Sequence, residues 1–348
     1  MIRHTTRPPS ARCTLPMYMG FLMSEPKSAT CTRLSEVMGI SHDSVTRFLW
    51  REGYEPKDLF DEASQLLNPV GGTLSVDDST LDKPYSRHMD LVSHVWSGKH
   101  HRVVKGINLI TLYYTDPQGR SLPVNYRVYD KTEHKTKNDY FLDMLVQVVA
   151  WGLQPDFITG DSWYSSASNL KTVRHHRMGF LFAVENNRRV AIEKGTWVQV
   201  QQLDIPDDGR KVWLRDFGEV KLFRTRLKDQ LRHYVVFLPQ ADAYEPFSQT
   251  EFQKRHDQHW HIEQYHRLIK QVCHIETFQV RRKVPILNPI FAALCSYVHL
   301  QQMQIHEVIT NAYQWQRDLY KEVVAGFVSS FIIGKDYLNP QYQAAVNA

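Results

Sequence analysis

The sequence contains few cysteines and no long uninterrupted hydrophobic segment. Its 348 residues include four cysteines, and none has the C-x-x-C spacing of a metal or redox motif; they are Cys13, Cys31, Cys273 and Cys295. Four cysteines are too few to stabilise a chain of this length, so the composition favours a reduced, cytoplasmic setting. The longest apolar run, residues 284–298, is interrupted by two prolines, whereas a membrane span needs about 18 consecutive apolar residues. We therefore expect no membrane-spanning helix.

Several common catalytic motifs are absent as well. The sequence has no glycine-rich phosphate loop of the Walker type, no G-x-S-x-G and no H-E-x-x-H, which argues against common classes of ATPase, serine esterase and zinc protease. The remaining composition is that of an ordinary globular protein, with 42% hydrophobic and 23% charged residues. This composition excludes disordered, collagenous and fibrous proteins.

The basic residues are grouped rather than abundant. The formal net charge is only +5, from 42 Lys and Arg against 37 Asp and Glu. Basic clusters occur at Arg47 with Arg51, and within residues 99–105, 224–228 and 281–283. Such clusters are typical of proteins that bind a polyanion such as DNA, although any one of them alone is more typical of a solvated loop.

The first 70 residues predict a leader and a pair of helices. Residues 1–30 are basic and without a clear pattern, and we expect them to be loosely ordered. Residues 31–70 have the layout of a helix-turn-helix, in which Gly39 supplies the turn and Ser41 caps the second helix. Its expected buried positions are Leu34, Val37, Ile40, Val45 and Leu49. Thr46 and Arg47 would then lie near the exposed start of the second helix, where such motifs contact DNA; a helical pair without a DNA role is the alternative.

The region from residue 72 onward predicts an α/β domain. Strand patterns at residues 73–79, 103–115 and 122–128 are followed by a helix, a strand at 157–161, a second helix and a strand at 180–184. This order matches a ribonuclease H-like mixed sheet flanked by helices. We expect residues 72–185 and 248–312 to form this domain, with residues 186–247 as a β-rich insertion and residues 313–348 as a C-terminal tail.

Three acidic residues are placed where this order would bring them together. Asp78 ends the first predicted strand, Asp161 follows a later one, and Glu263 lies on the helix after the insertion. Neighbouring strands are about 4.8 Å apart, so the two aspartates can share one metal ion. Three carboxylates that bind two Mg²⁺ or Mn²⁺ ions are typical of phosphodiester chemistry. The choice between Asp77 and Asp78 stays open, because adjacent strand residues point to opposite faces.

The residues around these acids resemble a known family. The strings V76-DDSTLDKP, R102-VVKGI, Y126-RVYD and G160-DSWYSS look like those of the DDE transposases of bacterial insertion sequences, in particular the branch named after insertion sequence 701 in the superfamily named after insertion sequence 4. The resemblance covers roughly residues 72–300.

That resemblance implies fold, chemistry and partners. It implies a ribonuclease H-like catalytic domain, two Mg²⁺ ions with Mn²⁺ as a substitute, and cut-and-paste movement of a short element. Its catalytic acids map onto Asp78, Asp161 and Glu263, with Asp78 favoured because it directly precedes a Ser-Thr pair. It further implies binding to terminal inverted repeats and target DNA, a homodimer on DNA, and a cytoplasmic location at the bacterial nucleoid.

The superfamily signature Tyr-x2-Arg-x3-Glu-x6-Lys is only half present. Glu263 and Lys270 fit it, whereas His256 and His259 stand at the tyrosine and arginine positions. On a helix His259, Glu263, Arg267 and Lys270 share one face, so the basic members can contact DNA phosphate beside the metal. The two substitutions leave open a transposase-derived DNA-binding protein without catalysis.

Two further hypotheses concern the histidines and the insertion. The histidines between His256 and His266 could form a zinc hydrolase site, but one helix does not place them all on one face. In the insertion, Trp213 is a candidate for stacking on a flipped DNA base, with Arg224 and Arg226 as phosphate contacts nearby. A place in the β core is the alternative for this tryptophan.

Overall fold

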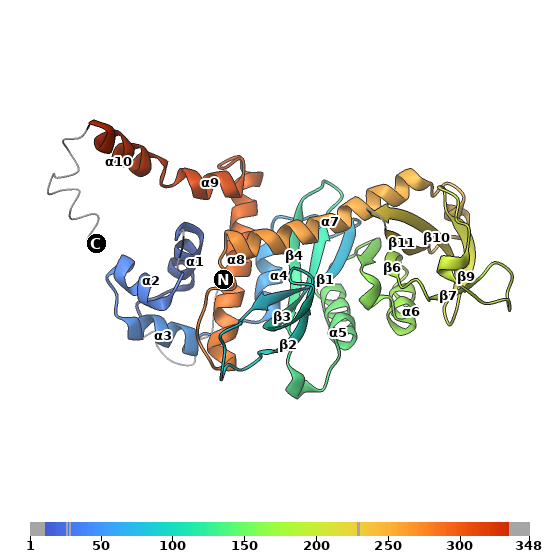
Figure 1. The fold of residues 1–348 in the computed structure, drawn as a ribbon, viewed down its shortest axis with the longest axis horizontal. Coiled ribbons are helices and arrows are strands. Elements are labelled where there is room, and N and C mark those ends of the chain that lie inside the picture. Colours follow the sequence, from blue (N-terminus) through green and yellow to red (C-terminus); the bar gives the residue numbers. More distant parts are fainter. Residues whose placement is uncertain (1–10, 26, 28, 228–229, 334–348) are drawn as a thin grey trace.

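One large mixed sheet organises the protein. The computed structural model describes residues 11–333 except 26, 28, 228 and 229, so the predictions for residues 1–10, for Lys228 and for residues 334–348 lie outside the described residues. Eleven strands have the order β2-β3-β1-β5-β6-β11-β10-β9-β7-β8, and β4 pairs with β3 off this path (Figure 1). The strands are β1 (Thr73–Asp82), β2 (Ser93–Ser97), β3 (Arg102–Thr115), β4 (Ser121–Val128), β5 (Phe157–Gly160), β6 (Gly179–Val184), β7 (Arg189–Ala191), β8 (Val198–Gln199), β9 (Arg210–Leu214), β10 (Gly218–Leu227) and β11 (Gln230–Phe237).

The central strands form because their residues are apolar on both faces. β3 is buried at every position from Gly106 to Thr115, and the whole of β5 is buried. β1 pairs antiparallel with β3 and parallel with β5, and β5 pairs parallel with β6. This mixed sheet with helices on its faces is the predicted ribonuclease H-like α/β class.

Helices cover opposite faces of the sheet. The helices are α1 (Leu15–Ser24), α2 (Cys31–Met38), α3 (His42–Arg51), α4 (Pro56–Ser64), α5 (Lys137–Ala150), α6 (Ala167–His175), α7 (Gln249–Gln271), α8 (Lys283–Ile305), α9 (Ala312–Asp318) and α10 (Lys321–Ile333). On β1, Thr73 bonds to Gln258 of α7, whereas Asp78 bonds to Lys137 of α5. Because odd and even strand positions point to opposite faces, α7 and α5 lie on opposite sides of β1.

The insertion is β-rich as predicted, but it does not form a separate sheet. β11 pairs antiparallel with β6, with Val236 opposite Leu181, and β10 and β9 follow in turn. The insertion therefore extends the central sheet beyond β6, and α7 runs back from it across the sheet (Figure 1).

The N-terminal prediction is right for the helical pair and wrong for the leader. Gly39 adopts a left-handed conformation with φ of 60° and Ser41 accepts the backbone N–H of Ser44, so α2 and α3 begin and end as expected. Residues 15–24, however, form the ordered helix α1, because Tyr18, Phe21 and Leu22 are buried. The predicted burial of Val37 is also wrong, since 53% of its side chain is exposed.

The N-terminal helices and α8 form one packed unit. α1, α3 and α4 all contact α8, Tyr54 stacks on Phe291 with ring centroids 4.2 Å apart, and Asn288 donates to the carbonyls of Leu49 and Glu52. Within the described residues, α8 is the one helix long and apolar enough to cross a membrane, but 78% of its apolar window is buried inside the fold. Its apolar character is explained by this burial.

Candidate active site

Two aspartates, Asp77 and Asp161, come from neighbouring strands. β1 and β5 pair in parallel with Val76 opposite Gly160, so Asp77 and Asp161 follow at the same level. Two residues earlier on each strand, the hydroxyls of Ser75 and Thr159 lie 2.8 Å apart. Side chains two residues apart on a strand share a face, and Asp161 remains in extended backbone. Asp77 and Asp161 therefore lie on the face of the sheet that α7 covers.

The first strand is longer than predicted, which changes the setting of its acids. β1 continues to Asp82, opposite Gly106 of β3. Asp77 and Asp78 are thus within the strand rather than at its end. They lie where β5 stops and leaves one side of β1 open, because the β1–β5 pairing ends at Val76.

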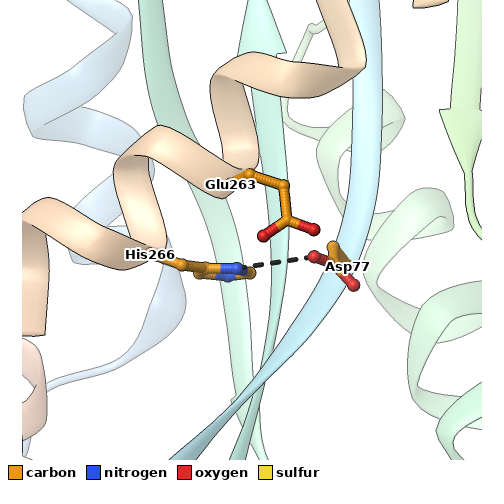
Figure 2. Close-up of side chains that lie close together, drawn as sticks. All are labelled: Asp77, Glu263 and His266. Atoms are coloured by element: carbon orange, nitrogen blue, oxygen red, sulfur yellow. Dashed lines mark ion pairs between the residues drawn. The ribbon is translucent and has the colours of Figure 1, made fainter. Parts of the chain in front are cut away.

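Glu263 reaches this place from α7. Ligand atoms of Asp77, Glu263 and His266 all lie within 4.8 Å of one another, and Figure 2 shows the two carboxylates and the imidazole converging from α7 and β1. Glu263 and His266 are three residues apart on α7, so they project from the same side of the helix. This is the group in the described part of the chain that could hold a metal ion.

Asp78 points to the other face of the sheet. Its carboxylate accepts hydrogen bonds from Asn108 Nδ2 at 2.6 Å, Lys137 Nζ at 2.8 Å and Tyr164 OH at 3.1 Å. These partners link β1 to β3, to the start of α5 and to the turn after Asp161. Asp78 thus has the contacts of a structural residue.

Burial and mutual repulsion raise the pKa values of the three acids. Burial, together with the neighbouring charge of Asp78, raises the pKa of Asp77 to about 7. Burial and the charges of Asp77 and Asp78 raise the pKa of Asp161 to about 7. The pKa of Glu263 is also raised, by desolvation and by Asp77, although its side chain reaches solvent. Carboxylates that repel one another in this way are typical of metal and catalytic sites.

The donor set fits a hard divalent cation. Carboxylate oxygens are the ligands that Mg²⁺ and Mn²⁺ prefer, and a dication would offset the repulsion among these acids. His266 adds a neutral imidazole, since burial lowers its pKa to about 4. Its Nδ1 lies 3.5 Å from Asp77 Oδ2, and its Nε2 is buried with no hydrogen-bond partner among the described residues.

The other predicted residues of α7 differ in their surroundings. Arg267 is exposed, and Lys270 donates to the Thr80 carbonyl at 2.7 Å and lies 3.3 Å from Glu276. His259 contacts the Thr159 hydroxyl at 3.1 Å, and burial lowers its pKa to about 4. It is therefore neutral at ordinary pH, and the phosphate contact expected of it stays a prediction.

The four histidines of α7 do not gather into one site. His256 contacts Tyr234 OH, His259 contacts Thr159, and His261 lies beside Ser121. His266 alone belongs to the metal-ligating group. The structure thus gives the zinc hydrolase reading no histidine cluster.

The remaining predicted DNA contacts lie away from the acids. Thr46 and Arg47 are on α3, half-buried and exposed respectively. Arg224 and Arg226 are exposed on β10, and Trp213 is half-buried on β9 with the Lys194 ammonium 5.3 Å from its ring centroid.

Two residues of the site, Asp77 and His266, were not chosen from the sequence. Alternation of buried and exposed residues along a strand would show which of Asp77 and Asp78 points to which face. In β1, however, Leu74, Ser75 and Val76 are all buried, so the pattern does not distinguish the two faces. The sequence indicates His266 only as one of the histidines of the zinc hypothesis. Its three-residue spacing from Glu263 was the available signal.

Comparison with known proteins identifies the class. The sequence model of the transposase DDE domain family matches residues 70–298, so the chain belongs to this family. It is a DNA transposase, an enzyme that cleaves DNA and transfers strands with the help of divalent metal ions.

Comparison of structures gives a similar fold. The chain resembles the piggyBac transposase in the cryo-EM structure of its synaptic complex with hairpin DNA, with a TM-score of 0.53 and 12% identity over 98% of this chain and 79% of the other. It also matches the Drosophila P element transposase in its strand transfer complex, with a TM-score of 0.28 and 10% identity over 54% and 48% of the two chains. A search of curated proteins by sequence finds no match.

Proposed function

We propose that this DNA transposase moves its element by cut-and-paste, with Asp77, Asp161 and Glu263 as the metal-binding acids. The observation that carries the proposal is the convergence of β1, β5 and α7 on one face of the sheet. Ligand atoms of Asp77 and Glu263 lie within 4.8 Å of each other. Val76 pairs with Gly160 in the sheet, so Asp77 and Asp161, the next residues, lie side by side.

Asp77 replaces Asp78 in this proposal. Asp78 has three hydrogen-bond partners on the opposite face, so it would have to break them to reach Glu263. Its contacts with Lys137 and Tyr164 instead hold the start of α5 and the turn that carries Asp161.

Two Mg²⁺ ions, or Mn²⁺ in their place, are the proposed cofactors. Such ions activate a water or 3′ hydroxyl and stabilise the leaving oxygen. Asp77, Asp161 and Glu263 would hold them, while His266 stays neutral and contacts Asp77 from the buried side. The raised pKa values of Asp77 and Asp161 mean that ion binding and proton loss are coupled at these acids.

The DNA contacts are proposed from position and charge. Arg267 and Lys270 lie one and two turns beyond Glu263 on α7 and are placed to contact phosphates beside the cut, and Thr46 with Arg47 of α3 to bind terminal repeats. The piggyBac complex contains hairpin DNA, which supports a hairpin step here and a base-stacking role for Trp213, with Arg224 and Arg226 as phosphate contacts.

The setting of the reaction is proposed as well. The resemblance to the insertion sequence 701 branch favours a bacterial element and action at the nucleoid. The piggyBac structure is a synaptic complex, and pairing of two element ends favours a homodimer on DNA.

The test is an end-cleavage assay. The purified full chain is incubated with a labelled duplex that spans the boundary of its own element, with Mg²⁺, Mn²⁺ or EDTA, beside Glu263→Gln. We expect nicking at the boundary in either metal, and none with EDTA or with the variant. Binding without cleavage in every metal would instead support the inactive DNA-binding protein and point to His256 and His259.

A further inference from the structure

The hairpin formed by β2 and the start of β3 is a basic, partly apolar surface outside the proposed metal site. We call residues 93–106 the β2–β3 ribbon. Its strands pair antiparallel, with His94 opposite Lys105 and Trp96 opposite Val103. β3 pairs with β1 only from Gly106 onward, so most of the ribbon is two-stranded.

The ribbon carries basic residues and no acid of its own. Between residues 91 and 115 the sequence contains no aspartate or glutamate, and its basic and imidazole residues are Lys99, Arg102, Lys105, His94, His100 and His101. All six side chains are exposed. Asp82 of β1 lies against Lys99 and His100, whereas Arg102 and Lys105 form no ion pair with the described residues, and their charge favours a polyanionic partner.

One face of the ribbon also exposes large apolar side chains. His94 and Trp96 alternate along β2, and Val103 and Lys105 along β3, so the register places all four on one face. Trp96 is 63% exposed and Val103 is 59% exposed. Two aligned, exposed apolar residues between basic ones are unusual for a strand pair that faces only water.

The ribbon is fastened beside the catalytic strand. Thr80 donates its hydroxyl to the Trp96 carbonyl at 3.1 Å, and Asp82 is contacted by His100 at 2.9 Å and Lys99 at 3.5 Å. At the base of the ribbon, a Cβ at Gly106 would meet the Thr80 side chain at 2.6 Å and the Leu81 carbonyl at 2.8 Å. The ribbon thus curls closely over the end of β1.

We propose that the β2–β3 ribbon binds duplex DNA next to the phosphate that is cut. A two-stranded β-ribbon fits the major groove, with Lys105 on a phosphate and Trp96 on sugar or base edges from one face. Arg102, which is opposite Ser97, would contact a phosphate from the other face.

Asp82, which anchors the tip of the ribbon, follows Asp77 by five residues, about 16 Å of strand. The side chains of Thr80 and Asp82, which fasten the ribbon, point to the Asp78 face of β1. The duplex would therefore reach the ribbon around the end of β1, roughly five base pairs from the cut at about 3.4 Å per base pair. This inference rests on the proposed function, because the cut phosphate defines the reference point.

Charge removal on the ribbon tests the proposal. The variant Arg102→Ala/Lys105→Ala is compared with Lys171→Ala/Lys321→Ala, which removes two positive charges from exposed sites on α6 and α10. Duplex binding is measured by fluorescence anisotropy across a salt series, and unfolding temperature checks the fold. We expect the ribbon variant to lose about tenfold in affinity near 0.15 M salt and its salt slope to fall by about 1.8. The control should match wild type.

A length series locates the contact. Duplexes that end about 0, 5 and 10 base pairs beyond the cut are bound by wild type and by Trp96→Ala. Wild-type affinity should rise as the duplex reaches the ribbon, and this rise should be smaller for Trp96→Ala. A photo-crosslinker at position 99 of the full chain should mark the same nucleotides, without depending on any loss of binding.

Strand transfer with pre-cut ends distinguishes the two sources of duplex. Weaker binding of element ends assigns the ribbon to the element, whereas normal end binding with weaker joining to a plasmid assigns it to target DNA. The proposal would be overturned if the ribbon variant bound duplex DNA with wild-type affinity and salt dependence and joined pre-cut ends at the wild-type rate. If the ribbon variants show the expected losses of DNA binding but the wild-type protein shows no metal-dependent cleavage, only the proposed function is contradicted.

Discussion

At the scale of single residues, the two adjacent aspartates of β1 have opposite roles. Burial, and then the neighbouring charge of Asp78, raises the pKa of Asp77 to about 7. Asp78 is matched by Lys137, Asn108 and Tyr164. Without a metal ion, Asp77 therefore lowers the stability of the folded protein, whereas Asp78 raises it.

The stability of two variants should show this difference. In EDTA at about pH 8, we expect Asp77→Asn to raise the free energy of unfolding by roughly 2 kcal/mol, because it removes a repelled, buried charge. Asp78→Asn should lower it by roughly 1–3 kcal/mol, because Lys137 loses its partner. Urea unfolding of both variants beside wild type measures the two changes. Equal destabilisation by both would contradict the assignment.

The pH dependence of the metal-free protein follows from the same acids. In the folded state the pKa values of Asp77 and Asp161 are about 7, against an ordinary value of 3.8. The folded protein therefore binds more protons than the unfolded chain between about pH 4 and 7, and this contribution to stability is lost as pH rises through that window. Thermal unfolding in EDTA should show the loss, and saturating Mg²⁺ should reduce it near pH 8. A metal-free stability that rises over this window in wild type relative to Asp77→Asn would contradict the account.

At the scale of elements, the site depends on close packing between β1, β5 and β6. A Cβ at Gly160 would lie 2.5 Å from the Phe182 ring and 2.8 Å from the Val76 side chain. Gly160 directly precedes Asp161, so any shift of β5 moves that carboxylate.

Gly160→Ala should therefore damage both stability and activity. We expect a loss of about 1–3 kcal/mol from overpacking and a fall in cleavage beyond what the lost stability explains. Gly20→Ala is the control, because a Cβ at Gly20 of α1 meets nothing within 4 Å, and alanine is the better helix former. Unfolding curves and end-cleavage rates of the two variants are compared. Wild-type cleavage by Gly160→Ala would show that β5 does not position Asp161.

Elements with local signals were predictable from the sequence. The glycine and serine at positions 39 and 41 mark the α2–α3 turn, and the seven-residue step from Glu263 to Lys270 marks the helix that carries the proposed third acid. The face of β1 that carries the proposed metal-binding acid was not predictable, because both faces are buried. The pairing of β11 with β6, which joins the insertion to the central sheet, depends on contacts between distant residues that leave no local pattern. The same holds for α1, whose burial is against α8.

At the scale of the whole molecule, the N-terminal helices and the catalytic sheet are one structural unit. α8 contacts β4 and α7 as well as α1, α3 and α4, and most of its length is buried. The α2–α3 helix pair is therefore not a separate domain, because its packing against α8 joins it to the rest of the fold.

Removal of residues 1–69 should leave the rest unable to fold well. Truncation would expose Phe291 and the neighbouring apolar surface of α8, which Tyr54 and the N-terminal helices cover. We expect the truncated chain to aggregate or to be digested much faster than the full chain in limited proteolysis. A soluble, protease-resistant fragment with a cooperative thermal transition would contradict this expectation.

The central claim is that Asp77, Asp161 and Glu263 form the metal site of this transposase. Its most direct test is the cleavage of a labelled element end in Mg²⁺ and Mn²⁺ by Asp77→Asn and Asp78→Asn, assayed at a temperature where both are folded. The account predicts that Asp77→Asn loses cleavage in both metals while it still binds the DNA, and that Asp78→Asn keeps measurable cleavage. Cleavage by Asp77→Asn together with its loss in Asp78→Asn would contradict the claim.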